Sequence, residues 1–324
     1  MQAICDTLLH QAREAGARGI RGGARLMTLL ENNPHLHLSF VQKTGVLQGP
    51  GTILGITGAP GSGKSTLTDA FLLEYRKRFP DRRIGVIAVD PSSPFSGGAI
   101  LGDRVRMMQH AIDPSIFIRS LATRGQLGGL ALGVKNVLSV MAWMGMDLVL
   151  IETVGVGQSE LDIVRIADEV AVVLAPGNGD SMQLLKAGLM EIGDFIVINK
   201  ADRAGAAELY HDVLTALQLA PGSEREVVLV SAMERTGISE LIDIVEGKAA
   251  LHSSERARSR RELHVNNVHQ FLKAIAHARM EKVMKEDAEI QGALSEMTSG
   301  TNGDWPSLVG RILGSAARQE GSHV

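Results

Sequence analysis

A glycine-rich loop near the start of the chain constrains the fold more than any other stretch. Residues 58–66 read Gly-Ala-Pro-Gly-Ser-Gly-Lys-Ser-Thr and match the P-loop pattern G-x-x-x-x-G-K-[ST]. An apolar run at 53–56 precedes the loop, and a helical pattern at 67–73 follows it. This order suits phosphate binding, because the glycines let backbone N–H groups surround an anion and the helix adds the positive end of its dipole. The stretch therefore predicts a nucleotide site.

Each residue of this loop has an expected role. Lys64 is expected to reach the outer phosphates, and the Ser65 hydroxyl is expected to ligate Mg²⁺. The predicted nucleotide contacts of the loop are Gly58, Ala59, Pro60, Gly61, Ser62, Gly63, Lys64, Ser65 and Thr66.

Apolar runs and helical patterns alternate from residue 52 to about 250. The predicted strands are 53–57, 84–90, 115–119, 148–151, 170–174, 195–199 and 227–231. The predicted helices between them are 66–78, 103–111, 127–145, 182–193 and 206–219. Continuous apolar strands are typical of parallel sheets buried on both faces, and parallel neighbours need crossover helices. We predict a doubly wound, mainly parallel α/β sheet of about seven strands, with its ligand site at the carboxyl ends of the strands.

Helical segments flank this region. Residues 1–48 predict an N-terminal helical extension, interrupted by the glycines of 19–23, and residues 49–250 form the nucleotide-binding domain. Residues 251–324 predict a C-terminal helical arm with one apolar stripe over 268–284. A second stripe comprises Leu308, Val309, Ile312, Leu313 and Ala316. These stripes are expected to bury against either the same chain or a second subunit.

Composition narrows the class of protein. With 44% hydrophobic residues the chain can bury a large core, and its net charge of -3 gives no general attraction to nucleic acid or anionic membranes. The longest mostly apolar run, 137–146, is too short to span a bilayer, and no secretory leader is recognisable. The single cysteine, Cys5, excludes an intrachain disulfide and fits a reducing compartment. We expect a cytoplasmic protein that binds neither nucleic acid nor membranes.

Three carboxylates are expected near the phosphate end of the site. Asp90 ends the second predicted strand, Asp103 opens the next helix, and Glu152 closes the strand at 148–151, as a Walker B acid does. Asp90 as a turn former, Asp103 as a helix N-cap and Glu152 as a buried partner of a lysine remain alternatives. Gly155 lies where its N–H is expected to bond the γ-phosphate, within a stretch that resembles a switch. The predicted metal ligands are Ser65, Asp90, Asp103 and Glu152, and the predicted catalytic residues are Lys64, Asp103 and Glu152.

The tetrapeptide Asn199-Lys200-Ala201-Asp202 predicts guanine recognition. It follows an apolar strand, and the Asp202 carboxylate can accept hydrogen bonds from the guanine N1–H and 2-amino groups, which adenine lacks. A second loop at the end of the last strand is expected to place a backbone N–H on the guanine O6. The predicted base contacts are Asn199, Lys200, Asp202, Ser231, Ala232 and Met233.

Taken together, these motifs resemble the MeaB/ArgK branch of the metallochaperone-class P-loop GTPases. Residues 90–93, 97–104 and 152–160 carry the resemblance, which extends over nearly the whole chain. It implies GTP/GDP and Mg²⁺ as ligands and a homodimer formed through the C-terminal helices. It also implies a chaperone that hydrolyses GTP, gates cofactor loading of an adenosylcobalamin-dependent methylmalonyl-CoA mutase and protects that mutase from inactivation.

Other functions remain open at this point. Sister GTPases deliver nickel, but the ten histidines of this chain are scattered and Cys5 is far from the motifs. A kinase-like phosphotransferase would need an acceptor pocket or catalytic loop that is not recognisable, whereas a scaffold that binds GTP and scarcely hydrolyses it would share the same ligands. No general base stands out. Candidates to position water are Gln158 and Glu160, and candidates for an additional cation are Arg104, Arg106 and Arg124.

Overall fold

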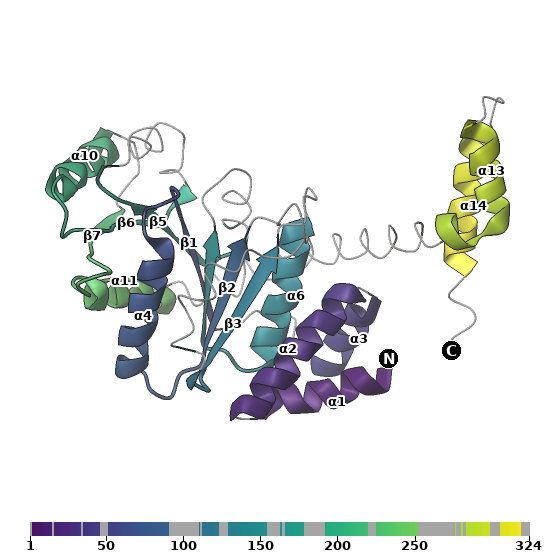
Figure 1. Cartoon of the computed structure of the whole chain (residues 1–324), viewed down its shortest axis with the longest axis horizontal. Helices are drawn as coiled ribbons and strands as arrows, with labels where there is room; N and C mark the ends of the chain where they lie inside the picture. The colour runs from purple at the N-terminus through teal and green to yellow at the C-terminus, as the bar shows by residue number, and fades with distance from the viewer. Residues whose placement is uncertain are drawn as a thin grey trace. The chain divides into compact units, whose positions relative to one another are not determined.

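The computed structural model divides the chain into two compact units, Met1–Arg260 and Arg261–Val324 (Figure 1). It describes residues 2–14, 16–33, 35–45, 51–90, 110, 112–122, 129–153, 163, 166–177, 192–219, 225–251, 276, 280, 283–298 and 305–318.

The first unit is built on a seven-stranded sheet in the order β3-β2-β4-β1-β5-β6-β7. Its strands are β1 (Thr52–Gly58), β2 (Ile84–Asp90), β3 (Ile116–Ala122), β4 (Leu148–Thr153), β5 (Glu169–Leu174), β6 (Phe195–Ile198) and β7 (Glu226–Leu229). Every pairing is parallel. The strand order reverses around β1, so the P-loop at the end of β1 lies at the switch point where ligands bind in such sheets. The predicted doubly wound parallel fold is confirmed.

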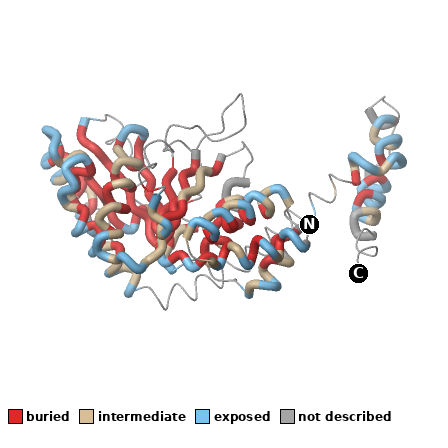
Figure 2. Tube along the Cα trace, turned by 60° about the horizontal axis from the view of Figure 1, so that its bottom comes forward, coloured by how far each residue is buried: buried red, intermediate tan, exposed pale blue. Residues whose placement is uncertain are grey.

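Helices cover both faces of the sheet, which explains why its strands are continuously apolar. Leu148 and Leu150 of β4 pack with α4 (Lys64–Arg78) and α11 (Ile238–Leu251). Val149 and Ile151, which alternate with them, pack with α6 (Gly129–Trp143) on the other face, where α10 (Ala206–Leu219) also covers β5 and β6. Figure 2 shows the buried residues gathered in the sheet. None of the helices within the described part of the chain has the length and apolar character needed to cross a membrane.

The N-terminal extension forms three helices, α1 (Gln2–Arg13), α2 (Gly16–Asn32) and α3 (His35–Thr44). The predicted interruption at 19–23 is wrong, because α2 runs through these glycines without a break. They are required by close packing instead. A Cβ at Gly19 would lie 1.9 Å from the Glu14 carbonyl oxygen, and one at Gly23 would lie 2.3 Å from the Met144 sulfur after α6. The absence of side chains thus lets α2 approach its neighbours.

Two glycines in helices provide a matched test of this packing. A Cβ at Gly22 would lie 2.7 Å from the Gln11 Cβ and 2.8 Å from the Ala12 nitrogen, whereas nothing lies within 4 Å at the exposed Gly247 of α11. We expect Gly22→Ala to lower the free energy of unfolding by about 1–3 kcal/mol, because the clash outweighs the gain in helix propensity. Gly247→Ala is expected to raise it by about 0.5–1 kcal/mol. Urea unfolding followed by circular dichroism measures the free energy of unfolding of both variants. If the two substitutions changed it in the same direction, this account of the packing would be contradicted.

The second unit contains α13 (Ala288–Thr298) and α14 (Trp305–Arg318). Asp287 caps α13, since its Oδ1 accepts hydrogen bonds from the backbone nitrogens of Glu289 (3.1 Å) and Ile290 (3.3 Å). The core of this unit comprises Val283, Ile290, Leu308 and Ile312. In contrast, Val309 and Leu313 of the second predicted stripe are 47% and 53% exposed. Most of the first predicted stripe lies outside the described residues.

Candidate nucleotide-binding site

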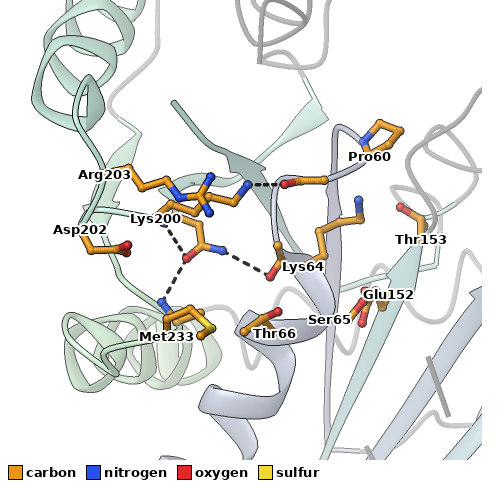
Figure 3. A pocket seen from close by; sticks show the side chains of 14 residues that line it. Pro60, Lys64, Ser65, Thr66, Glu152, Thr153, Lys200, Asp202, Arg203 and Met233 are labelled. Atoms are coloured by element: carbon orange, nitrogen blue, oxygen red, sulfur yellow. Dashed lines mark hydrogen bonds between the residues drawn. The ribbon is translucent and has the colours of Figure 1, made fainter. Parts of the chain in front are cut away.

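A cavity of about 510 Å³ opens at the carboxyl ends of β1, β4 and β6 (Figure 3). Its lining residues are Pro60, Gly61, Gly63, Lys64, Ser65, Thr66, Glu152, Thr153, Asn199, Lys200, Asp202, Arg203, Ala232 and Met233. The structure thus brings the P-loop, the strand-end acid and both predicted base loops to one cavity. Asp103 and Gly155 lie outside the described residues. Asp90 ends β2, and only its backbone is described.

Two glycines give the P-loop its path. Gly58 has a φ of 145° and Gly63 a φ of 89°, values that side chains strongly disfavour. A Cβ at Gly58 would lie 2.1 Å from the Val173 carbonyl oxygen, and one at Gly63 would lie 2.5 Å from the Asn199 amide nitrogen. Glycine is therefore the residue that lets the loop pass close to both β5 and the Asn199 loop.

Lys64 is the first residue of α4, and its side chain is buried at 6% exposure. Its Nζ donates to the carbonyl oxygens of Gly58 (2.8 Å) and Ala59 (3.0 Å), so the ammonium lies over the loop. The helix has no side-chain N-cap and no acidic residue in its first turn. Its first backbone N–H groups and its dipole thus favour an anion at this end of the cavity.

Glu152 meets two hydroxyl groups of α4 at the same end. Ser65 Oγ donates to Glu152 Oε1 at 2.6 Å, and Thr68 Oγ1 donates to Oε2 at 3.2 Å. Glu152 is 5% exposed, so these hydrogen bonds compensate for its burial. A serine hydroxyl beside a carboxylate is an all-oxygen donor set, which fits Mg²⁺. Among the residues that the structure describes, no three His, Cys, Asp or Glu side chains gather as a metal cluster.

Asn199 joins the base loops to the P-loop. Its Nδ2 donates to the Ser62 carbonyl oxygen at 2.9 Å, and its Oδ1 accepts from the backbone nitrogens of Ala232 (3.1 Å) and Lys200 (2.8 Å). Lys200 Nζ donates to the Gly61 carbonyl oxygen at 2.6 Å. These two side chains, predicted as base contacts, therefore brace the loops around the cavity in this structure.

Asp202 is exposed at the opposite end of the cavity from Glu152 (Figure 3). Ser231 Oγ donates to its Oδ1 at 2.5 Å, which orients the carboxylate. This hydrogen bond, helped by the charges of Arg203 and Lys200, holds the pKa of Asp202 below its ordinary value of 3.8. The carboxylate is thus an ionised hydrogen-bond acceptor at neutral pH.

Sequence reasoning missed three residues of the site. Thr68 donates to Glu152. Thr153 lines the cavity, and its Oγ1 donates to Thr57 Oγ1 at 3.1 Å. Arg203 lines the base end of the cavity. Thr68 lies one helical turn after Ser65, so the i, i+3 spacing was an available signal for it. Arg203 follows the base motif directly.

Comparison with known proteins places the chain among GTPases. A family model described as "Methylmalonyl Co-A mutase-associated GTPase MeaB" matches residues 23–289. A protein of Pyrococcus abyssi, named as a candidate GTPase, is 46% identical over 265 residues, which cover 80% of each chain. GTPase ArgK of Escherichia coli is 38% identical over 252 residues, or 74% of this chain and 75% of the relative. A crystal structure described as a LAO/AO transport system kinase superposes with a TM-score of 0.64 at 25% identity, covering 96% of this chain and 97% of that one.

Proposed function

The chain belongs to the MeaB family of GTPases, and we propose that it couples GTP binding and hydrolysis to the maintenance of an adenosylcobalamin-dependent methylmalonyl-CoA mutase. In this role it gates cofactor loading and protects the mutase from inactivation. The observation that carries the nucleotide assignment is a single cavity with Lys64 at one end and Asp202 at the other. The mutase is proposed on the family description, and a cytoplasmic location is proposed on the lone cysteine.

Hydrolysis proceeds, in this proposal, by in-line attack of water on the γ-phosphorus. The P–O bond to the β-phosphate breaks, GDP leaves with its electron pair, and the water proton passes to solvent or phosphate. The Lys64 ammonium leaves its two backbone carbonyl partners and binds phosphate oxygens instead. There its charge stabilises the transition state more than the ground state. The candidates for positioning water, Gln158 and Glu160, lie outside the described residues.

Ser65 and Glu152 would hold Mg²⁺, with Asp90 and Asp103 proposed nearby. When bound, the ion neutralises charge on the β- and γ-phosphate oxygens. Thr68 holds the second oxygen of Glu152, so it fixes how the carboxylate is turned toward Ser65.

Thr68 offers an isosteric test of this arrangement. Thr68→Val removes the hydroxyl donor and keeps the shape of the side chain. We therefore expect the Mg²⁺ concentration that gives half of the maximal effect on nucleotide binding to rise about 5-fold, which corresponds to the loss of one hydrogen bond. Thr68→Ser keeps the donor and is the control. Titration of Mg²⁺ against a fluorescent GDP analogue measures the effect. If the valine variant required the same Mg²⁺ concentration as the parent chain, Thr68 would have no role in metal binding.

We also propose a homodimer formed through the C-terminal helices. Val309 and Leu313 lie one turn apart on α14 and stay exposed after the second unit has formed its own core, so they are available to a second copy. A monomer in sedimentation equilibrium at micromolar concentration would exclude this assembly.

The function is tested by phosphate release from GTP and ATP, with and without the mutase. We expect release from GTP only, accelerated by the mutase, because partner-completed GTPase sites gain on the order of 10³–10⁵ in rate. If phosphate release were selective for GTP but unchanged by the mutase, the GTPase activity would stand and the mutase would be excluded as the partner. A preference for ATP would overturn the role of Asp202.

A further inference from the structure

The outer side of α2 carries a row of arginines, Arg18, Arg21 and Arg25. They follow one another at spacings of three and four residues, so they lie on one side of the helix. All three are exposed, and the Arg18 side chain is 67% exposed. The glycines on the opposite side of α2 are buried, and the helix packs against α1, α3 and α6 (Figure 1). A firmly packed helix therefore presents the arginine row to solvent.

The arginine row does not stabilise the helix that carries it. Arg18 lies in the first turn of α2, where the helix dipole is positive, and that turn contains no acidic residue. Glu31 lies in the last turn, at the negative end of the dipole, and no basic residue lies there. Each end of α2 thus holds the sign of charge that its dipole disfavours. Charges that are kept against the stability of their own helix indicate a role outside that helix.

Ion pairs within the chain account for only part of these charges. Glu31 is compensated by Arg119 of β3 at 2.8 Å, and Arg18 pairs with Glu14 at 3.2 Å. In contrast, neither Arg21 nor Arg25 forms an ion pair with any residue that the structure describes. The centre of the arginine row is therefore available to an anionic group from outside the chain.

The C-terminal end of α4 shows the opposite arrangement. Lys77 and Arg78 lie in its last turn, where the helix dipole favours cations. Lys77 pairs with Glu74, and Arg78 pairs with Asp243. These two charges stabilise the chain that contains them. The same charge reversal made at both places can therefore distinguish an outward-facing role from local stabilisation.

The length and charge of the arginine row limit what it can bind. The row extends about 10 Å along the helix, at 1.5 Å per residue, and it belongs to a chain with a net charge of -3. Proteins on DNA commonly contact roughly six to ten phosphates, and membrane-binding segments carry clusters of about four to eight lysines or arginines. Three arginines are too few for either polyanion. A protein surface with a few carboxylates fits better, because guanidinium groups bind carboxylates with two parallel hydrogen bonds and arginine is enriched at protein interfaces.

We propose that the arginine row of α2 is the surface on which an acidic face of the partner protein docks. The partner is the mutase of the proposed function, on which this inference rests. Because α2 is already held by its packing, little further order has to be gained when the partner binds. Exposed charges at an interface act mainly on the rate of association, and salt weakens them by screening.

Charge reversal tests this docking surface. Arg21→Glu combined with Arg25→Glu is expected to raise the Kd for the mutase at least about 10-fold at low salt, mainly by slowing association, because like charges would then face each other. The difference from the parent chain should narrow between about 50 and 300 mM NaCl. Surface plasmon resonance with immobilised mutase, and with the chain bound to a non-hydrolysable GTP analogue, measures both rate constants. GTP hydrolysis without the mutase should be unchanged, since neither residue lines the cavity.

Lys77→Glu combined with Arg78→Glu is the matched control, because it changes the net charge by the same amount. We expect the two double variants to behave in opposite ways. Reversal on α4 should lower the melting temperature, since it removes two ion pairs and opposes the helix dipole. It should leave the Kd for the mutase within about 2-fold of the parent value, as expected for exposed pairs away from the interface. Reversal on α2 should not lower the melting temperature.

The possible outcomes separate the docking surface from the proposed function. Equal mutase affinity of the parent chain and the α2 variant would overturn the docking surface and leave the mutase as the partner. If the mutase did not bind the parent chain, both the partner and its docking surface would be wrong. If the parent chain instead bound a DNA duplex of about 20 base pairs or phosphatidylserine vesicles, and the α2 variant did not, the arginine row would bind a polyanion and the proposal would be wrong.

Discussion

Lys64→Met is expected to lower the rate of GTP hydrolysis by at least about 10²-fold, the usual loss when one transition-state donor is removed. The methionine keeps most of the length and volume of the side chain but carries no charge. In the structure, the Lys64 ammonium is held by two backbone carbonyls at the mouth of the P-loop. Phosphate oxygens that gain charge in the transition state would attract this ammonium more strongly than those carbonyls do. The loss should therefore be larger in kcat than in GDP affinity.

Two measurements distinguish this effect from misfolding. The melting temperature of the nucleotide-free variant should stay close to that of the parent chain, since the packing of α4 is retained. The increase in melting temperature on adding GTP should shrink, because a ligand that binds the folded state stabilises it less when its Kd is higher. A Lys64→Met variant with parental kcat would show that charge at this position does not assist the reaction.

Most of the sheet and the location of the site were predictable from local patterns. The strand, loop and helix around residues 58–66 follow from spacing alone, and continuously apolar strands indicate burial on both faces. The prediction of a helix interruption at residues 19–23 was wrong. The glycines there allow close packing, and one of them lies against Met144, which is distant in the chain. No local signal reports such a contact.

The orientation of the side chains in the site likewise depends on hydrogen bonds between residues that are far apart in the sequence. The sequence motif predicts that Asn199 lies near the base, but its hydrogen bonds to Ser62 and Ala232 join segments far apart in the chain. The Ser231–Asp202 and Thr68–Glu152 hydrogen bonds are of the same kind. A motif fixes residue types and their order, whereas the direction of each side chain is decided by tertiary packing. The sequence thus predicts which residues lie at the site, and the structure shows which of them orient the side chains of the others.

Asp202→Asn is expected to weaken GTP binding by at least about 10²-fold and to strengthen binding of xanthosine triphosphate. The carboxylate can accept from both N1–H and the 2-amino group of guanine, and hydrogen bonds to an ionised acceptor are stronger than those between neutral groups. An asparagine amide turns a donor toward the 2-amino group, which leaves two donors opposed. Xanthine carries a carbonyl oxygen at that position, so the same amide can pair with it. Competition between the two nucleotides against a fluorescent GDP analogue measures the inversion.

The pH dependence of GTP selectivity follows from the state of this carboxylate. In the folded chain the pKa of Asp202 lies below its ordinary value of 3.8, chiefly because Ser231 donates to it. The charged form is thus kept as pH falls and is lost only below that value, so the ratio of GTP to ITP affinity should stay flat between pH 8 and about pH 5. Ser231→Ala removes the orienting bond and should weaken GTP binding modestly while leaving the carboxylate charged at pH 7. If GTP selectivity fell between pH 8 and 5, or survived in Asp202→Asn, another group would be reading the base.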